Sequence, residues 1–337
     1  MSMNKLNGIA FVQIIAALLI VNYHTSSLDI PILSQVAKFG FIFNTVFVFL
    51  SGFLLARSLS KTPAPTYSEF LYKRFNRIYP SFHIALLLIS FIYLWIGQEF
   101  TINSLLLSAT GFAYFFGENT FGDHLWFVSV ILACYLVCIP TYHALKRHPL
   151  TFFMLLLIVT LITIFAFEKS FNGIYNKVSG VIMYRFLYHY IVFSLSLYIG
   201  MQRTEIASQG KQWKWMGIFV VVFPLYLWLQ PQPRLGLIAI GAALLVAICT
   251  IQVVLMVSPF FKKHFPQVFL LSIITYEIYL IHYAVIAAID ISYHGKYIAF
   301  PLVFLISISL AFLIFMMSKP YERLTRRCTG WLLRYAP

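Results

Sequence analysis

The chain has 337 residues, of which 61% are hydrophobic and 10% are charged, and its mean hydropathy is +0.85. A soluble protein of this length could not bury so much apolar surface, and long apolar runs recur from end to end. The formal net charge is +14. In a membrane protein a basic excess of this kind marks the cytoplasmic loops. We therefore expect a polytopic membrane protein that does not bind nucleic acid.

Apolar segments of membrane length predict an all-α fold with about ten transmembrane helices. Helices satisfy their own backbone hydrogen bonds in lipid, and the alternating pattern of a membrane barrel is absent. The predicted spans are 7–25, 39–57, 79–97, 125–144, 150–167, 181–201, 215–229, 235–257, 267–289 and 297–318. The apolar segment 102–116 has only about 15 residues, which favours a re-entrant or interfacial position. We expect one integral membrane domain over residues 1–337, with no fused soluble domain.

The basic residues predict the orientation. With a cytoplasmic N-terminus, most of the 24 lysines and arginines lie on the inner side. Those that fall outside are Lys38, Lys169, Lys177, Arg234 and Lys296. We expect both termini in the cytoplasm, a multi-pass location in the cell inner (cytoplasmic) membrane, and the lipid bilayer as a partner.

Two polar side chains lie in the first predicted span. An ionisable group at membrane depth is costly and rarely persists without a function or a partner. His24 is such a group, and a histidine can accept or donate a proton near neutral pH. Gln13 lies eleven residues earlier, about three helical turns, so both side chains share nearly one face, roughly 16 Å apart along the axis. This polar stripe predicts the wall of a site.

A basic motif, Tyr72–Pro80, precedes the third predicted span. Arg74 and Arg77 are three residues apart, so on a helix they share one face, and paired guanidinium groups bind phosphate strongly. The alternative is a cluster of topogenic charge that touches anionic lipid. Before this motif, the small residues Ser51 and Gly52 indicate close helix packing.

The segment Asp123–Trp126 opens the fourth predicted span at the outer surface. Trp126 is explained either as a residue of the interfacial aromatic belt or as part of a site. His124 is either a loop residue or a contact for a polar acceptor. In the second case Asp123 is placed to orient its ring.

The ninth predicted span contains a carboxylate and an imidazole. Glu277 and His282 are five residues apart, so they point about 140° away from each other and should not pair directly. Each should face the interior of the bundle, either in a structural hydrogen bond or in a functional role. Arg185, in the sixth span, should have an anionic partner, and Glu277 is a candidate.

Several familiar motifs are missing. The sequence has no Walker loop, no Gly-x-Ser-x-Gly motif, no zinc signature and no dinucleotide fingerprint. The four cysteines, Cys134, Cys138, Cys249 and Cys328, show neither metal-ligand nor disulfide spacing. We expect no metal, and any bound nucleotide must be recognised by basic side chains.

In this order, the motifs resemble those of the acyltransferase-3 family of integral membrane acyltransferases. Each is weak alone, but the ordered set is specific and runs nearly end to end. The matching segments are Ile15–His24, Val46–Leu55, Lys73–Pro80, His124–Phe127, Tyr276–His282 and Lys319–Glu322.

The resemblance implies transfer of an acyl group, usually acetyl, from cytoplasmic acetyl-CoA to a sugar hydroxyl. The acceptor would be a cell-surface polysaccharide such as lipopolysaccharide, or a lipid-linked glycan precursor. His24 matches the essential histidine of the family, and Arg74 and Arg77 match its basic motif. Gln13 is a departure, because the family generally has arginine eleven residues before the histidine.

These observations lead to one working hypothesis, an O-acetyltransferase of surface glycans. His24 would be the general base, with His282 and His124 as further catalytic candidates. An acetyl-histidine relay stays open beside direct transfer. The expected acetyl-CoA contacts are Arg74, Arg77, Gln13, Lys73 and Arg185. Two alternatives stay open, a transporter or export subunit and an impaired family member that scaffolds glycan synthesis. The oligomeric state is not predicted.

Overall fold

The computed structural model describes residues 3–25, 40–60, 65–170, 178–202, 217–218, 220–221, 236–292 and 300–335. These residues form helices and connecting turns, with no strand among them, so the predicted all-α fold is confirmed. The α-helices are α1 Met3–His24, α3 Gly40–Leu59, α4 Tyr67–Trp95, α5 Ile102–Ala109, α6 Trp126–Arg147, α7 Pro149–Ser170, α8 Val178–Met201, α10 Gly236–His264, α11 Thr275–Ser292 and α12 Phe300–Tyr335. Three 3-10 helices, η1 Ala113–Phe116, η2 Asp123–Leu125 and η4 Pro266–Ile273, connect them.

Within these ranges, five helices are long and apolar enough to cross a membrane. A sixth results if η4 and α11, which meet at an angle of 75°, count as one broken span. The membrane-compatible segments are Ile42–Leu59, Tyr67–Trp95, Asp123–Arg147, Leu245–His264 and Pro301–Thr325. The chain is therefore a multi-pass membrane protein.

Helices of the described ranges overlap every predicted span except 215–229, most of which lies outside the described residues. The total of ten spans and the cytoplasmic position of both termini stay predictions. Segment 102–116 forms α5, a turn and η1 rather than one long helix. Neither helix is long enough to cross a membrane alone, which agrees with the prediction that the segment is not a full span. Its re-entrant or interfacial position stays a prediction.

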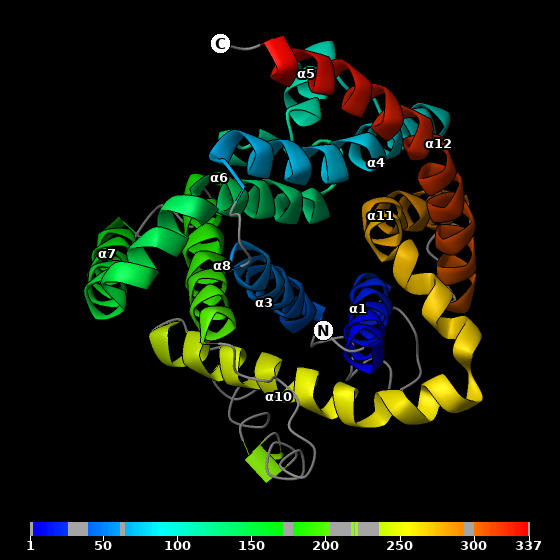
Figure 1. Ribbon diagram of the computed structural model, residues 1–337. Helices are drawn as coiled ribbons and strands as arrows, with labels where there is room; N and C mark the ends of the chain where they lie inside the picture. The colour runs from blue at the N-terminus through cyan, green and yellow to red at the C-terminus, as the bar shows by residue number, and fades with distance from the viewer. Residues whose placement is uncertain are drawn as a thin grey trace.

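The two helices α1 and α3 stand in the middle of the bundle, surrounded by α4, α6, α8, α10, α11 and α12 (Figure 1). Their apolar side chains are buried, including Phe11, Ile20, Leu50 and Phe53. By contrast, α7 and α12 leave large apolar side chains exposed, as expected for helices that face lipid. The predicted polar stripe of Gln13 and His24 therefore belongs to a helix in the middle of the bundle and not to one on its outside.

A close contact between α3 and α8 depends on two glycines. A Cβ atom on Gly52 would lie 2.7 Å from the carbonyl oxygen of Phe193, and one on Gly200 would lie 2.7 Å from that of Phe53. Helices approach this closely only where side chains are absent. The helix-packing explanation of Gly52 is confirmed. Its neighbour Ser51 instead forms a hydrogen bond with the Tyr135 hydroxyl at 2.9 Å.

The basic motif lies in a helix rather than in a loop, because α4 begins twelve residues before the predicted span. Thr66 and Glu69 form a capping box at its start: the Glu69 amide donates to Thr66 Oγ1, and the Thr66 amide donates to Glu69. Reciprocal capping satisfies backbone donors that would otherwise be unpaired. Arg74 and Arg77 therefore extend from one helical surface, as their spacing predicts.

Candidate active site

The three histidines proposed as catalytic come together from three helical elements. The ring centroid of His282, on α11, lies 5.2 Å from that of His24, at the end of α1. It lies 5.1 Å from that of His124, in η2. Tyr283 packs against the same group, with its ring 5.1 Å from His124 and 5.4 Å from His24. We call His24, His124 and His282 the histidine cluster.

Backbone carbonyls determine the tautomers of two of these rings. His282 Nδ1 lies 2.7 Å from the Tyr279 carbonyl oxygen, and His124 Nε2 lies 2.9 Å from the Leu280 carbonyl oxygen. A carbonyl oxygen only accepts, so each of these nitrogens carries the hydrogen. His282 Nε2 and His124 Nδ1 are then left with lone pairs, and neither has a hydrogen-bond partner among the described residues. Two unoccupied acceptor nitrogens thus lie beside His24.

The cluster members differ in their access to solvent. His282 is fully buried and His124 is 2% exposed. His24 is half-buried. A group that touches a substrate must be reachable, so His24 is the member best placed to do so.

Asp123 does not orient His124, and this expectation is wrong. Asp123 is exposed, and its Oδ1 accepts a hydrogen bond of 2.7 Å from Asn119 Nδ2. The Leu280 carbonyl orients the imidazole instead, and the Tyr279 hydroxyl donates to the His124 carbonyl. The start of α6 is therefore tied to α11 at two points.

The proposed pairing of Arg185 with Glu277 is also wrong. Glu277 Oε1 accepts a hydrogen bond of 2.6 Å from Ser81 Oγ on α4. Its Oε2 is buried and has no hydrogen-bond partner among the described residues. Arg185 instead donates from Nη1 to the Tyr114 hydroxyl at 2.6 Å. No hydrogen bond joins Glu277 to His282, as their spacing predicts.

The basic motif of α4 lies near a part of α6 that is farther along α6 than the histidine cluster. Arg74 Cζ lies 5.9 Å from the centre of the Phe70 ring, and its Nε is buried without a partner in the described structure. At the start of α4, the Tyr67 hydroxyl donates to the Leu136 carbonyl at 2.7 Å. Leu136 is ten residues along α6 from Trp126, which is roughly 15 Å, and the charges of Arg74 and Arg77 act on Tyr135, the residue before Leu136. The motif and the histidine cluster therefore lie at different depths of the bundle.

No contact within the described part of the chain gathers the remaining expected acetyl-CoA contacts around Arg74. Lys73 and Arg77 are exposed on α4. Gln13 is half-buried within α1, which is continuous from Met3 to His24. The predicted placement of Gln13 and His24 on one helix is confirmed, and the structure leaves their separation of three turns unchanged.

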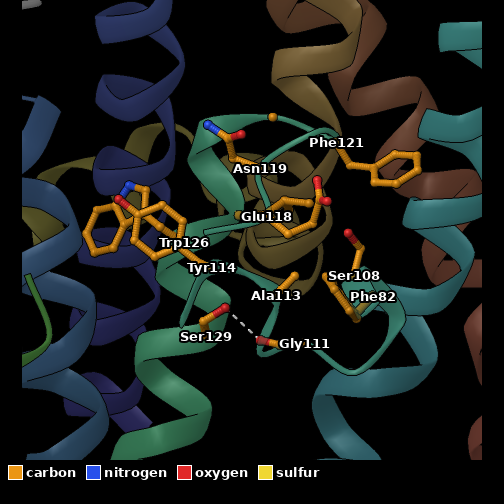
Figure 2. Close-up of a pocket in the computed structure, with 12 residues that line it drawn as sticks. Phe82, Ser108, Gly111, Ala113, Tyr114, Glu118, Asn119, Phe121, Trp126 and Ser129 are labelled. Atoms are coloured by element: carbon orange, nitrogen blue, oxygen red, sulfur yellow. Dashed lines mark hydrogen bonds between the residues drawn. The ribbon is translucent and has the colours of Figure 1, made fainter. Parts of the chain in front are cut away.

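A small pocket lies beside the cluster, between the loop that precedes α6 and the helices below it (Figure 2). Its volume is about 20 Å³, which is room for about one water molecule. The side chains of Tyr114, Glu118, Asn119 and Trp126 are among those that line it. Ser129 closes its floor by donating to the Gly111 carbonyl at 2.7 Å. As it stands, the pocket is too small for a sugar.

Glu118, at the edge of this pocket, is turned toward its own loop. Its Oε1 accepts hydrogen bonds from the Thr120 amide and hydroxyl, and its Oε2 accepts one of 2.9 Å from Ser104 Oγ. Burial raises the pKa of this carboxyl group, but the hydrogen bonds from Thr120 and Ser104 outweigh burial and lower it. The carboxylate therefore stays ionised with both oxygens occupied.

Several residues of this region were not predicted from the sequence. Tyr279 and Tyr283 contact the histidine cluster, and Tyr114 and His189 surround Arg185 and Trp126. Tyr279 was within reach, because it precedes His282 by three residues and so shares its helical face. Nothing in the sequence indicated that Tyr114 contacts Arg185, since Tyr114 lies in a short apolar segment far from Arg185 along the chain.

The His124 ring occupies space that a side chain at position 122 would fill, so Gly122 is required there. Its φ is 108°, and a Cβ there would lie 2.8 Å from His124 Nδ1 and 3.0 Å from Tyr283. Gly122→Ala should lower the free energy of unfolding by about 1–3 kcal/mol more than a change that adds backbone strain alone. The measurement is chemical unfolding in detergent, with Gly97→Ala as the control. Gly97 also has a positive φ, 76°, but nothing lies within 4 Å of its added Cβ. Equal losses in the two variants would contradict the prediction.

Comparison with known proteins gives the family. A family model described as an acyltransferase domain, Acyl_transf_3, matches residues 6–318. Searches with this chain found no match among curated proteins or among solved structures. The matched range contains all three histidines of the cluster and the basic motif of α4. The chain therefore belongs to the acyltransferase-3 family and is a membrane acyltransferase.

Proposed function

We propose that this protein transfers an acetyl group from cytoplasmic acetyl-CoA to a sugar hydroxyl of a cell-surface polysaccharide or a lipid-linked glycan precursor. The observation that carries the proposal is the convergence of His24, His124 and His282 from distant parts of the sequence. Acyl transfer to a hydroxyl needs a base, and imidazole is the side chain most often used.

In the proposed mechanism His24 acts as the general base. Its imidazole takes the proton of the acceptor hydroxyl while the hydroxyl oxygen attacks the thioester carbonyl. The bond between the carbonyl carbon and sulfur then breaks, and the coenzyme A thiolate leaves and takes up the proton. His24 has this role because it is half-buried, whereas the other two histidines are enclosed. A relay through acetyl-histidine would use the same group as nucleophile.

His282 and His124 would support His24 rather than replace it. Their N–H groups are committed to the backbone carbonyls of Tyr279 and Leu280. Each therefore offers a lone-pair nitrogen that can accept a hydrogen bond from His24. Rings fixed in this way would hold the base in one orientation, so no free energy is needed to reorganise them during the reaction.

The donor would bind with its phosphates on α4. Arg74 and Arg77 offer two guanidinium groups on one helical surface, with Lys73 beside them. Guanidinium groups bind phosphate with paired, charge-assisted hydrogen bonds. The phosphates and the thioester lie at opposite ends of coenzyme A, which suits a basic motif and a base at different depths of the bundle. Gln13, three turns before His24 on α1, would offer an amide to the pantetheine arm.

The test is transfer of radiolabelled acetyl from acetyl-CoA to membrane glycans. Purified protein in nanodiscs should bind acetyl-CoA saturably, and glycans of cells that contain it should carry acetyl groups that disappear on deletion. Mass spectrometry of the surface glycans reads out the second result. Absence of saturable binding together with unchanged glycans would exclude this function and favour a transporter or a scaffold.

A further inference from the structure

Arg185 lies between two aromatic rings beside the proposed reaction centre. Its Cζ is 4.9 Å from the centre of the Trp126 ring and 5.8 Å from that of Tyr114. Nη1 donates to the Tyr114 hydroxyl at 2.6 Å. The Arg185 carbonyl accepts from His189 Nδ1 one turn later, at 2.7 Å, and the His189 ring lies 5.1 Å from Trp126. The guanidinium is thus fixed in position by three helical elements.

The charge of Arg185 has no counter-ion within this part of the chain. No carboxylate of the described residues lies within 4.0 Å of it, and its hydrogen-bond partner is a neutral phenol. Keeping a cation in a membrane helix without an anion is costly. A guanidinium has five N–H donors in a planar fork, and this side chain is only half-buried. The guanidinium group is therefore held in one position and is still partly accessible to a ligand.

The surroundings of Arg185 point to the acceptor rather than the donor. Tyr114 and Trp126, which hold the guanidinium, both line the pocket of Figure 2. Trp126 is two residues from His124, so Arg185 and the histidine cluster flank the same helix start. The basic motif that would take the donor phosphates lies roughly 15 Å farther along α6. At the Arg185 end of the bundle, coenzyme A has its uncharged thioester.

We infer that Arg185 binds an anionic oxygen group of the acceptor, a carboxylate or a phosphate, and so sets a preference for acidic over neutral sugars. This inference rests on the proposed acetyltransferase function. It also changes the expected role of Arg185, which the sequence had placed among the acetyl-CoA contacts. Glu118 does not oppose such a ligand strongly, because both of its oxygens are engaged within its own loop.

The experiment compares three soluble acceptors that share a glucose ring. They are methyl glucoside, methyl glucuronide and glucose 1-phosphate, which carry no charge, a carboxylate and a phosphate. With protein in nanodiscs and radiolabelled acetyl-CoA, the wild type should show a kcat/KM at least tenfold higher for one or both anionic acceptors. A preference for glucuronide alone assigns a carboxylate, and one for glucose 1-phosphate alone assigns a phosphate. Arg185→Gln should remove the preference for anionic over neutral acceptors, while Arg185→Lys should keep part of it.

A second measurement separates this inference from the proposed function. The same three compounds should be tested for a shift in the Tm of the protein without acetyl-CoA. An anionic compound should raise the Tm of the wild type but not of Arg185→Gln, whether or not acetyl transfer occurs. Equal kcat/KM values for the three acceptors, or a preference that survives in Arg185→Gln, would overturn the inference. If no acetyl transfer occurs, the absence of any Arg185-dependent Tm shift would overturn it.

Discussion

Replacing His24 with alanine is expected to lower acetyl transfer by about 10²–10⁴-fold, the usual contribution of a general base. The reason is positional, because His24 is the reachable member of a cluster whose other rings are buried and tied to the backbone. The buried partners cannot move into its place. The measurement is the rate of radiolabelled acetyl transfer, with the dissociation constant of acetyl-CoA measured in parallel.

The dissociation constant should stay within a few-fold of the wild-type value, since in the proposed arrangement the phosphates bind at a level roughly 15 Å farther along α6 than the histidine cluster. His143→Ala serves as the control, because His143 is an exposed histidine near the far end of α6. It should transfer acetyl at the wild-type rate. Transfer by His24→Ala at more than a tenth of the wild-type rate would show that another group is the base.

Replacing both Arg74 and Arg77 with glutamine should raise the dissociation constant of acetyl-CoA by at least about 100-fold. A hydrogen bond to a charged group contributes about 1.5–3 kcal/mol, and each 1.4 kcal/mol is a factor of ten. Arg74 should contribute more than Arg77 to the change in the dissociation constant, because its Nε is buried without a partner in the described structure. Calorimetric titration of protein in nanodiscs measures the change.

Arg147→Gln is the matched control for the arginine pair. Arg147 is exposed in the last turn of α6, and its replacement removes one positive charge where the double variant removes two. It should leave the dissociation constant unchanged if Arg74 and Arg77 act by contact. An equal effect in Arg147→Gln would instead indicate general attraction of an anion or of anionic lipid, which is the alternative explanation of this basic motif.

Much of the site was predictable because polar groups are rare and costly in membrane helices. His24 and His282 each stood out within a long apolar run, and His124 stood out at the start of another. The structure brings these three rings together, although 258 residues separate His24 from His282. The helical spacing rule also correctly separated Glu277 from His282. Local rules worked here because one helix determines which of its own residues share a face.

The partners of these side chains were not predictable in the same way. Asp123 is next to His124, yet the carbonyl of Leu280 orients that ring. Glu277 seemed the natural anion for Arg185, yet its partner is Ser81, and Arg185 bonds to Tyr114. Proximity in sequence and opposite charge are weak guides when several packed helices compete for the same group.

The sequence alone therefore determined the helical membrane class, the family and the set of candidate side chains for the site. All of these depend on composition, helical period and ordered local motifs. Only the tertiary structure decided which ring nitrogens are committed to the backbone, which histidine is reachable and which groups Arg185 contacts. Those properties depend on how α1, α6, α8 and α11 approach one another, and such contacts join residues far apart in the chain.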